Sequence, residues 1–81
     1  MTITIKFNDN IPHKYNSFEE ILKLDNYNDI IYIGCAYNKL FNLPELPNSL
    51  EYLSCNDNKL SSLPELPKSL KILHCSNNYL S

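Results

Sequence analysis

Hydrophobic and polar positions recur along this chain with a period of 20 residues, beginning at residue 30. The segment 30–40 reads IIYIGCAYNKL, and it is echoed by LEYLSCNDNKL at 50–60 and by LKILHCSNNYL at 70–80. Aliphatic residues align in columns that start at positions 30, 33, 40, 43 and 46, a cysteine column starts at 35, and an asparagine column starts at 38. A fixed period of this length is typical of repeat proteins, in which each unit buries the hydrophobic side of the next.

Each copy of the repeat predicts one short strand around its second aliphatic position, at residues 33, 53 and 73. Equivalent strands of stacked copies make a parallel sheet, and their inward residues are apolar because they meet the same column of the neighbouring copy. The asparagine amides are expected to bond backbone groups where the chain leaves each strand, since an unpaired buried group costs about 1–3 kcal/mol. The phrase LPELP, at 43–47 and 63–67, excludes a full helix between strands because proline fixes φ and lacks an N–H.

The first 29 residues do not repeat and have a different pattern. Residues 2–7, TITIKF, alternate polar and apolar side chains and predict a half-buried strand with Ile3, Ile5 and Phe7 on one face. A turn is expected at residues 8–10, because short polar side chains tolerate tight backbone conformations.

A short helix is predicted over about residues 18–24, because Ser17 followed by Glu20 is a capping-box signature. The polar stretch at 25–29 predicts a loop, and His13 is placed in a loop with no partner.

A chain of 81 residues makes a single domain. We expect residues 1–29 to form an N-terminal cap of one strand and one helix that covers Ile30 and Ile33. Residues 30–81 then hold two full repeats and a partial third.

The pattern L-x-x-L-x-C-x-x-N-x-L, joined by L-P-x-L-P, resembles one form of leucine-rich repeat. It is similar to the short repeats of bacterial effector proteins and to the cysteine-bearing repeats of leucine-rich repeat proteins from giant DNA viruses and amoebae. The resemblance covers residues 30–81 and implies an α/β solenoid with a short parallel sheet on the concave side and an extended convex side. It also implies a protein-interaction domain. Some of the bacterial effectors are ligases, but their activity resides in a separate catalytic domain, for which this chain has no room.

Charge and composition narrow the range of partners. The formal net charge is −2 and all seven basic residues are lysine, so neither nucleic acid nor an anionic membrane is an expected partner. No apolar run approaches the roughly 20 residues that span a bilayer, and the first residues are too short and too alternating for a secretion signal. We therefore expect an intracellular, cytoplasmic protein, located in the host cytoplasm if it is viral or effector-derived.

Cysteines 35, 55 and 75 suggest a metal site, a redox pair or a thiol enzyme, because stacked thiols would lie about 4.8 Å apart. Against this, the sequence has no C-x-x-C motif. The side chains of an in-register column are also parallel to one another, so they do not converge on one metal ion. Cysteine is also among the most buried residue types, so a column of small core side chains is favoured. His74 adjoins Cys75, but alternation in a strand places neighbours on opposite faces. We expect no enzyme activity, no metal and no cofactor.

The spacing of Pro44 and Pro47, repeated 20 residues later, matches the P-x-x-P pattern of SH3 ligands. A return path between strands explains the same spacing, and Leu46 and Leu66 are then expected to be buried.

Outward strand positions and the turns beyond them are the candidate partner-binding surface. Tyrosine and exposed isoleucine favour a protein interface, although cross-strand stacking that merely stabilises the sheet is the alternative. The leading expectation is non-catalytic binding of a protein partner through this concave face or through an open end. The candidate residues are Tyr32, Tyr52, Ser54, Asn56, Asp57, Ile72, His74 and Asn77.

The third copy breaks off at Ser81, before another LPELP phrase. Repeat arrays normally need a polar terminal cap, so an exposed C-terminal edge is predicted at Lys71, Leu73 and Leu80. A homodimer through this end would cover it, which makes a structural, self-assembling protein the second expectation. A fragment of a longer array, or a naturally short chain that frays at its end, would also explain the missing cap.

Overall fold

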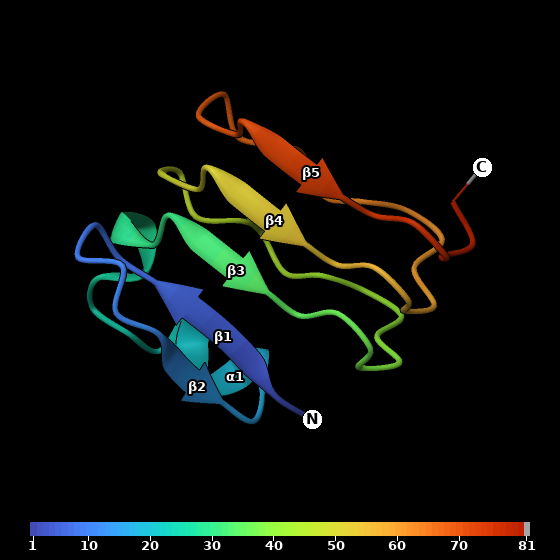
Figure 1. Cartoon of the computed structure of the whole chain (residues 1–81), viewed down its shortest axis with the longest axis horizontal. Helices are drawn as coiled ribbons and strands as arrows, with labels where there is room; N and C mark the ends of the chain where they lie inside the picture. The colour runs from blue at the N-terminus through green and yellow to red at the C-terminus, as the bar shows by residue number, and fades with distance from the viewer. Residues whose placement is uncertain (81) are drawn as a thin grey trace.

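The computed structural model describes residues 1–80, which form one five-stranded mixed sheet and one short helix (Figure 1). The strands lie in the order β2-β1-β3-β4-β5. Their bounds are Ile3–Lys6 for β1, His13–Tyr15 for β2, Tyr32–Gly34 for β3, Tyr52–Ser54 for β4 and Ile72–His74 for β5. Helix α1 spans Phe18–Leu22, and a 3-10 turn, η1, spans Tyr27–Asp29.

The three strands of the repeat region are parallel, which confirms the predicted parallel sheet. Tyr32 lies opposite Tyr52, which lies opposite Ile72, so equivalent residues of the copies face one another. The connecting segments 40–49 and 60–69 contain bends and turns but neither helix nor strand, as their prolines predict.

The N-terminal strand extends this sheet in the antiparallel sense, with Ile5 opposite Ile33. The amide of Asn38 fixes its start, donating to the Thr2 carbonyl at 2.9 Å and accepting from the Thr2 N–H at 3.3 Å. The predicted strand at 2–7 is thereby confirmed, and so is the turn after it, where Asn10 has a φ of 61°. Ile30 and Ile33, which the N-terminal residues were to cover, are both fully buried.

The expectation of a loop around His13 was wrong. His13 begins β2, which pairs with β1, and its ring meets that of Phe7 edge-on with centroids 5.7 Å apart. Three mainly polar residues show no alternation of polar and apolar side chains from which a strand could be predicted. The strand β2 forms because these residues pair with β1 across the turn.

The predicted helix is present but ends at Leu22 rather than at residue 24. Ser17 Oγ accepts a hydrogen bond from the Glu20 N–H, whereas the Glu20 carboxylate accepts from the N–H of Asn16 rather than from that of Ser17. The polar loop expected after the helix contains the 3-10 turn η1. The Tyr27 hydroxyl donates to the Glu45 carbonyl and so ties this turn to the segment 40–49 between β3 and β4.

A single core joins the N-terminal region to the repeats. In Figure 1, α1 lies behind β1 and β2, and its Ile21 is buried with the inward residues of the strands. Leu46 is 4% exposed, as expected, but its equivalent Leu66 is 40% exposed, because the third copy covers less of it. The buried core comprises Ile3, Ile5, Ile21, Ile30, Ile33, Cys35, Leu46, Leu50, Leu53, Cys55 and Leu60.

Within residues 1–80, neither α1 nor η1 has the length or the apolar character needed to cross a bilayer.

Candidate protein interface

A row of aromatic rings crosses the face of the sheet that is opposite the core. Alternation along the strands directs Ile33 and Leu53 inward and Tyr32 and Tyr52 outward. The rings of Tyr32 and Tyr52 stack with centroids 4.9 Å apart and planes inclined by 24°. The His74 ring continues the row at 5.5 Å from that of Tyr52. The in-register repeat therefore builds a continuous aromatic surface across three strands.

Gly34 allows this arrangement. A Cβ atom at this position would lie 2.8 Å from the Tyr32 hydroxyl oxygen and 3.1 Å from the ring carbon Cε1. The Tyr32 ring can therefore lie flat along its own strand, over the chain's single glycine, and still stack on Tyr52.

Lys6 extends the row onto β1, and the sequence reasoning missed it. Its Nζ lies 4.7 Å from the centroid of the Tyr32 ring, within the range of a cation–π contact. The signal was present, because alternation in TITIKF places Lys6 on the face opposite Ile3 and Ile5. Burial, with smaller contributions from Tyr52 and Cys35, raises the pKa of the Tyr32 hydroxyl.

The structure brings five of the eight candidate residues together on this open face. Tyr32, Tyr52 and Ser54 are half-buried there, whereas Ile72 and His74 are exposed.

The other three candidates lie in the turns beyond the strands. The side-chain oxygen of Asn56 accepts from the Ser76 N–H at 2.7 Å, so this group already serves the fold. Asp57 and Asn77 have left-handed backbones, with φ of 58° and 56°, which their short polar side chains tolerate. They adjoin the open face but are not part of it.

The asparagine column bonds backbone groups where the chain leaves each strand, as predicted, and in doing so it also joins the copies. The buried Asn58 amide donates to the carbonyls of Cys35 and Cys55, and its oxygen accepts from the N–H groups of Asn38 and Leu40. Asn78 repeats this role one copy later, so this column belongs to the scaffold.

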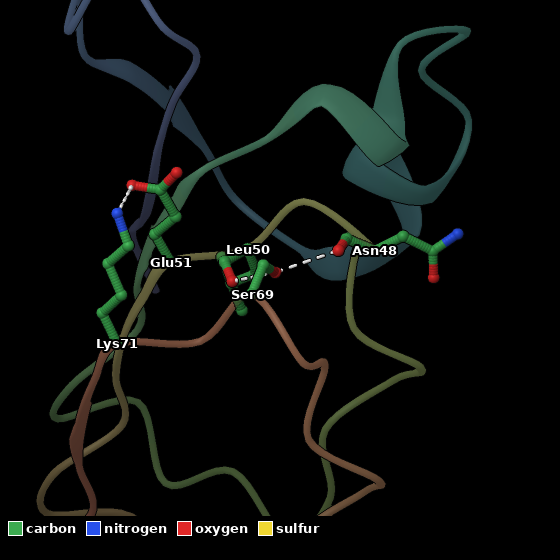
Figure 2. A network of polar contacts seen from close by, with 5 residues as sticks. All are labelled: Asn48, Leu50, Glu51, Ser69 and Lys71. Carbon is green, nitrogen blue, oxygen red and sulfur yellow. Dashed lines mark hydrogen bonds and ion pairs between the residues drawn. The ribbon is translucent and has the colours of Figure 1, made fainter.

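A serine column, which the sequence reasoning also missed, joins the copies at the opposite end of the strands. Ser49 Oγ donates to the Ile30 carbonyl at 2.7 Å. Figure 2 shows the equivalent Ser69, whose hydroxyl lies 2.6 Å from the Leu50 carbonyl and 3.0 Å from that of Asn48. The signal was the recurrence of serine after 20 residues, directly before the first aliphatic position.

The predicted self-association edge is only partly exposed. Lys71 is exposed, but its Nζ lies 3.6 Å from the Glu51 carboxylate (Figure 2). Leu73 and Leu80, which were expected to be exposed, are half-buried because both pack against the core.

The cysteines are free thiols with the character of core residues. Cys35 and Cys55 are fully buried, and burial, with a smaller effect of the next thiol, raises their pKa values to about 12 and about 11. Cys75 packs against the core while the His74 ring lies on the open face against Tyr52, so the two cannot act together. Within residues 1–80, no group of three His, Cys, Asp or Glu side chains is placed to hold a metal ion.

Protein-family models, curated proteins and solved structures give no match for this chain. Its open face therefore has to be interpreted from its own residues. It offers aromatic rings, one exposed isoleucine and one lysine, which suit contact with another protein better than covalent chemistry.

Proposed function

We propose that this protein is a small leucine-rich repeat solenoid that binds a protein partner, without catalysis, through the open face of its sheet. The Tyr32–Tyr52–His74 row is the observation that carries the proposal. Aromatic side chains provide large contact area with little conformational freedom to lose, and they are enriched where interfaces concentrate their binding energy.

Exposed Ile72 gives this face an apolar contact beside the rings. Lys6 and the tyrosine hydroxyls add polar groups to this face, and protein interfaces commonly combine apolar and polar contacts in this way. Because the strands are three or four residues long, the face suits a transient interface at or below about 1,200 Å² of total buried area.

The test is a comparative pull-down from the source cell with the wild type, the double variant Ile72→Asn/His74→Ala and the control Ile11→Ser. Ile72, His74 and Ile11 are all exposed, so each variant is expected to keep its fold, which circular dichroism can check. We expect a subset of the proteins that bind the wild type and Ile11→Ser to be lost from the double variant. A double variant that still captures every protein captured by the wild type would overturn the assignment of this face.

A second candidate function is self-assembly through β5, which in residues 1–80 pairs with a neighbour on one side only. Sedimentation across a concentration series measures it, and a monomer at high concentration would count against it.

A further inference from the structure

A second surface lies at the end of the sheet where the parallel strands finish. The segments that follow β3, β4 and β5 gather there, toward the lower right of Figure 1. We call this surface the aromatic–lysine edge and define it by Tyr37, Lys39, Phe41, Lys59 and Tyr79.

Backbone hydrogen bonds join the successive copies at this edge, and the Tyr37 N–H donates to the Asn56 carbonyl at 3.1 Å. The Lys59 N–H donates to the Leu40 carbonyl and the Tyr79 N–H to the Leu60 carbonyl, both at 2.8 Å. The Nζ of Lys59 lies 5.5 Å from the centroid of the Phe41 ring, which joins the copies at the level of side chains.

The aromatic side chains of this edge are unusually exposed. Tyr37 is 78%, Tyr79 69% and Phe41 65% exposed, and within residues 1–80 no other large hydrophobic side chain reaches these values. The hydrophobic core therefore does not account for the choice of aromatic residues here. Exposed apolar groups that cluster in this way are typical of contact surfaces.

The backbone of Tyr37 gives a second, independent argument. Its φ is 60°, in the left-handed region that L-residues disfavour. The equivalent residues Asp57 and Asn77 adopt the same conformation, but their short polar side chains tolerate it. Folding alone would thus favour asparagine or aspartate at position 37, so a bulky, solvent-facing tyrosine there indicates a role outside the fold.

The charge of this edge specifies the chemistry of its partner. Within residues 1–80 the ion pair joins Lys71 to Glu51, so Lys39 and Lys59 have no carboxylate partner among these residues. Asp57 lies in the turn after β4 at this same end, but within residues 1–80 it forms no ion pair with either lysine. Asp9, Asp29 and Glu51 line a hollow of about 520 Å³ at the other end of the sheet, formed by the residues that follow β1 and precede β3 and β4. Unpaired lysines among exposed aromatic rings complement a segment that carries both carboxylates and apolar side chains.

We propose that the aromatic–lysine edge docks an acidic segment of a partner protein. Carboxylates of that segment pair with Lys39 and Lys59, while its apolar side chains pack on Tyr37, Phe41 and Tyr79. Single-stranded nucleic acid is another anionic partner that can stack on aromatic rings. Proteins that bind it follow its phosphate backbone with a long basic groove, which two lysines do not supply. The net charge of −2 also opposes it.

This docking does not depend on the open face. The two surfaces share no defining residue, so a variant of one should leave the other intact. Loss of peptide binding in Ile72→Asn/His74→Ala would contradict that separation.

The experiment measures fluorescence anisotropy of a labelled peptide of about twelve residues, built from Glu, Asp, Phe and Gly, against the same peptide with Gln and Asn in place of the acids. We expect saturable binding of the acidic peptide only, weakened by added salt. Lys39→Gln/Lys59→Gln should lower the affinity about tenfold, and the control Lys14→Gln/Lys23→Gln should leave it unchanged.

Tyr37→Asn separates binding from folding. It should weaken the peptide about fivefold while raising the urea midpoint, because asparagine accepts the left-handed backbone. No binding up to about 1 mM would overturn the proposal, as would equal binding of the neutral peptide. Tighter binding of oligothymidylate than of the peptide, lost in the double lysine variant, would assign this edge to nucleic acid instead.

Discussion

At the scale of single residues, Asn58 links two copies of the repeat through hydrogen bonds to their main chains. Its amide group meets carbonyls of two copies and N–H groups of the turn before it, all within 3.2 Å. Among side chains only glutamine carries the same amide, and its additional methylene would move that amide away from these partners.

Asn58→Ala should therefore lower the free energy of unfolding by about 2–4 kcal/mol, because it leaves several buried backbone groups without partners. Asn78→Ala is the matched control, since Asn78 is less buried and makes fewer contacts with the copy before it. It should cost about 1–2 kcal/mol in the same urea titration. Equal losses in the two variants would contradict the role given to burial.

The cysteine column predicts an order of thiol reactivity. The raised pKa values of Cys35 and Cys55 favour the neutral thiol, so at pH 8 far fewer of these thiols are ionised than in an ordinary cysteine. Labelling by a thiolate-selective reagent should start at half-buried Cys75, and labelling of the other two should rise about tenfold per pH unit from pH 7 to 10. Peptide mass spectrometry resolves the three sites, and unfolded protein, in which all react alike, is the control.

At the scale of elements, the aromatic row depends on the shape of β3. Gly34→Ala should push Tyr32 off its strand, because a Cβ would meet the ring edge and hydroxyl within 3.2 Å. We expect a loss of about 1 kcal/mol and a changed tyrosine signal in near-ultraviolet circular dichroism. Ser54→Ala, at the equivalent position of β4, is the control and should leave the spectrum as it is. An unaltered spectrum in Gly34→Ala would show that the ring lies elsewhere.

The elements differ in how far their sequence foretold them. The three parallel strands were predictable because one pattern occurs three times, so each copy supports the interpretation of the others. The strand β2 was not, since three residues carry no period and their pairing with β1 comes from tertiary structure. The capping box at α1 was recognisable from the sequence. The contact of the Glu20 carboxylate with the N–H of Asn16 was not, because the exact end of a helix depends on the path by which the preceding residues enter it.

The candidate face shows the same division. Tyr32, Tyr52 and His74 could be placed on one side by alternation alone. Their contact with Lys6 could not, because the expected cap over Ile30 and Ile33 did not include an antiparallel pairing of β1 with β3, which sets Lys6 opposite Tyr32. The exposure of Phe41 and Tyr79 could not be predicted either, because it depends on how the chain turns after β3 and β5.

At the scale of the whole molecule, burial decreases from the N-terminal region toward the third copy. Ile33 and Leu53 are fully buried, whereas their equivalent Leu73 is half-buried. The N-terminal strand and helix supply one side of the core, so the first two copies are covered on both sides.

Leu53→Ala should consequently cost about 2–5 kcal/mol, and Leu73→Ala about half as much, because cavity cost scales with the packing that is lost. Thermal or urea unfolding measures both, and amide hydrogen exchange should be fastest in residues 70–80. A larger cost for Leu73→Ala would mean that the third copy is packed by contacts other than those described.

The joints between copies have a consequence for how such a chain can change. Ser49, Ser69, Asn58 and Asn78 each reach back to main-chain groups of the preceding copy, never to its side chains. A peptide carbonyl or N–H is the same whatever residue bears it, so each joint is indifferent to its neighbour's identity. A 20-residue unit that carries this serine and this asparagine can then be duplicated, deleted or exchanged in frame with these main-chain joints preserved, leaving the outward positions free to acquire new specificities.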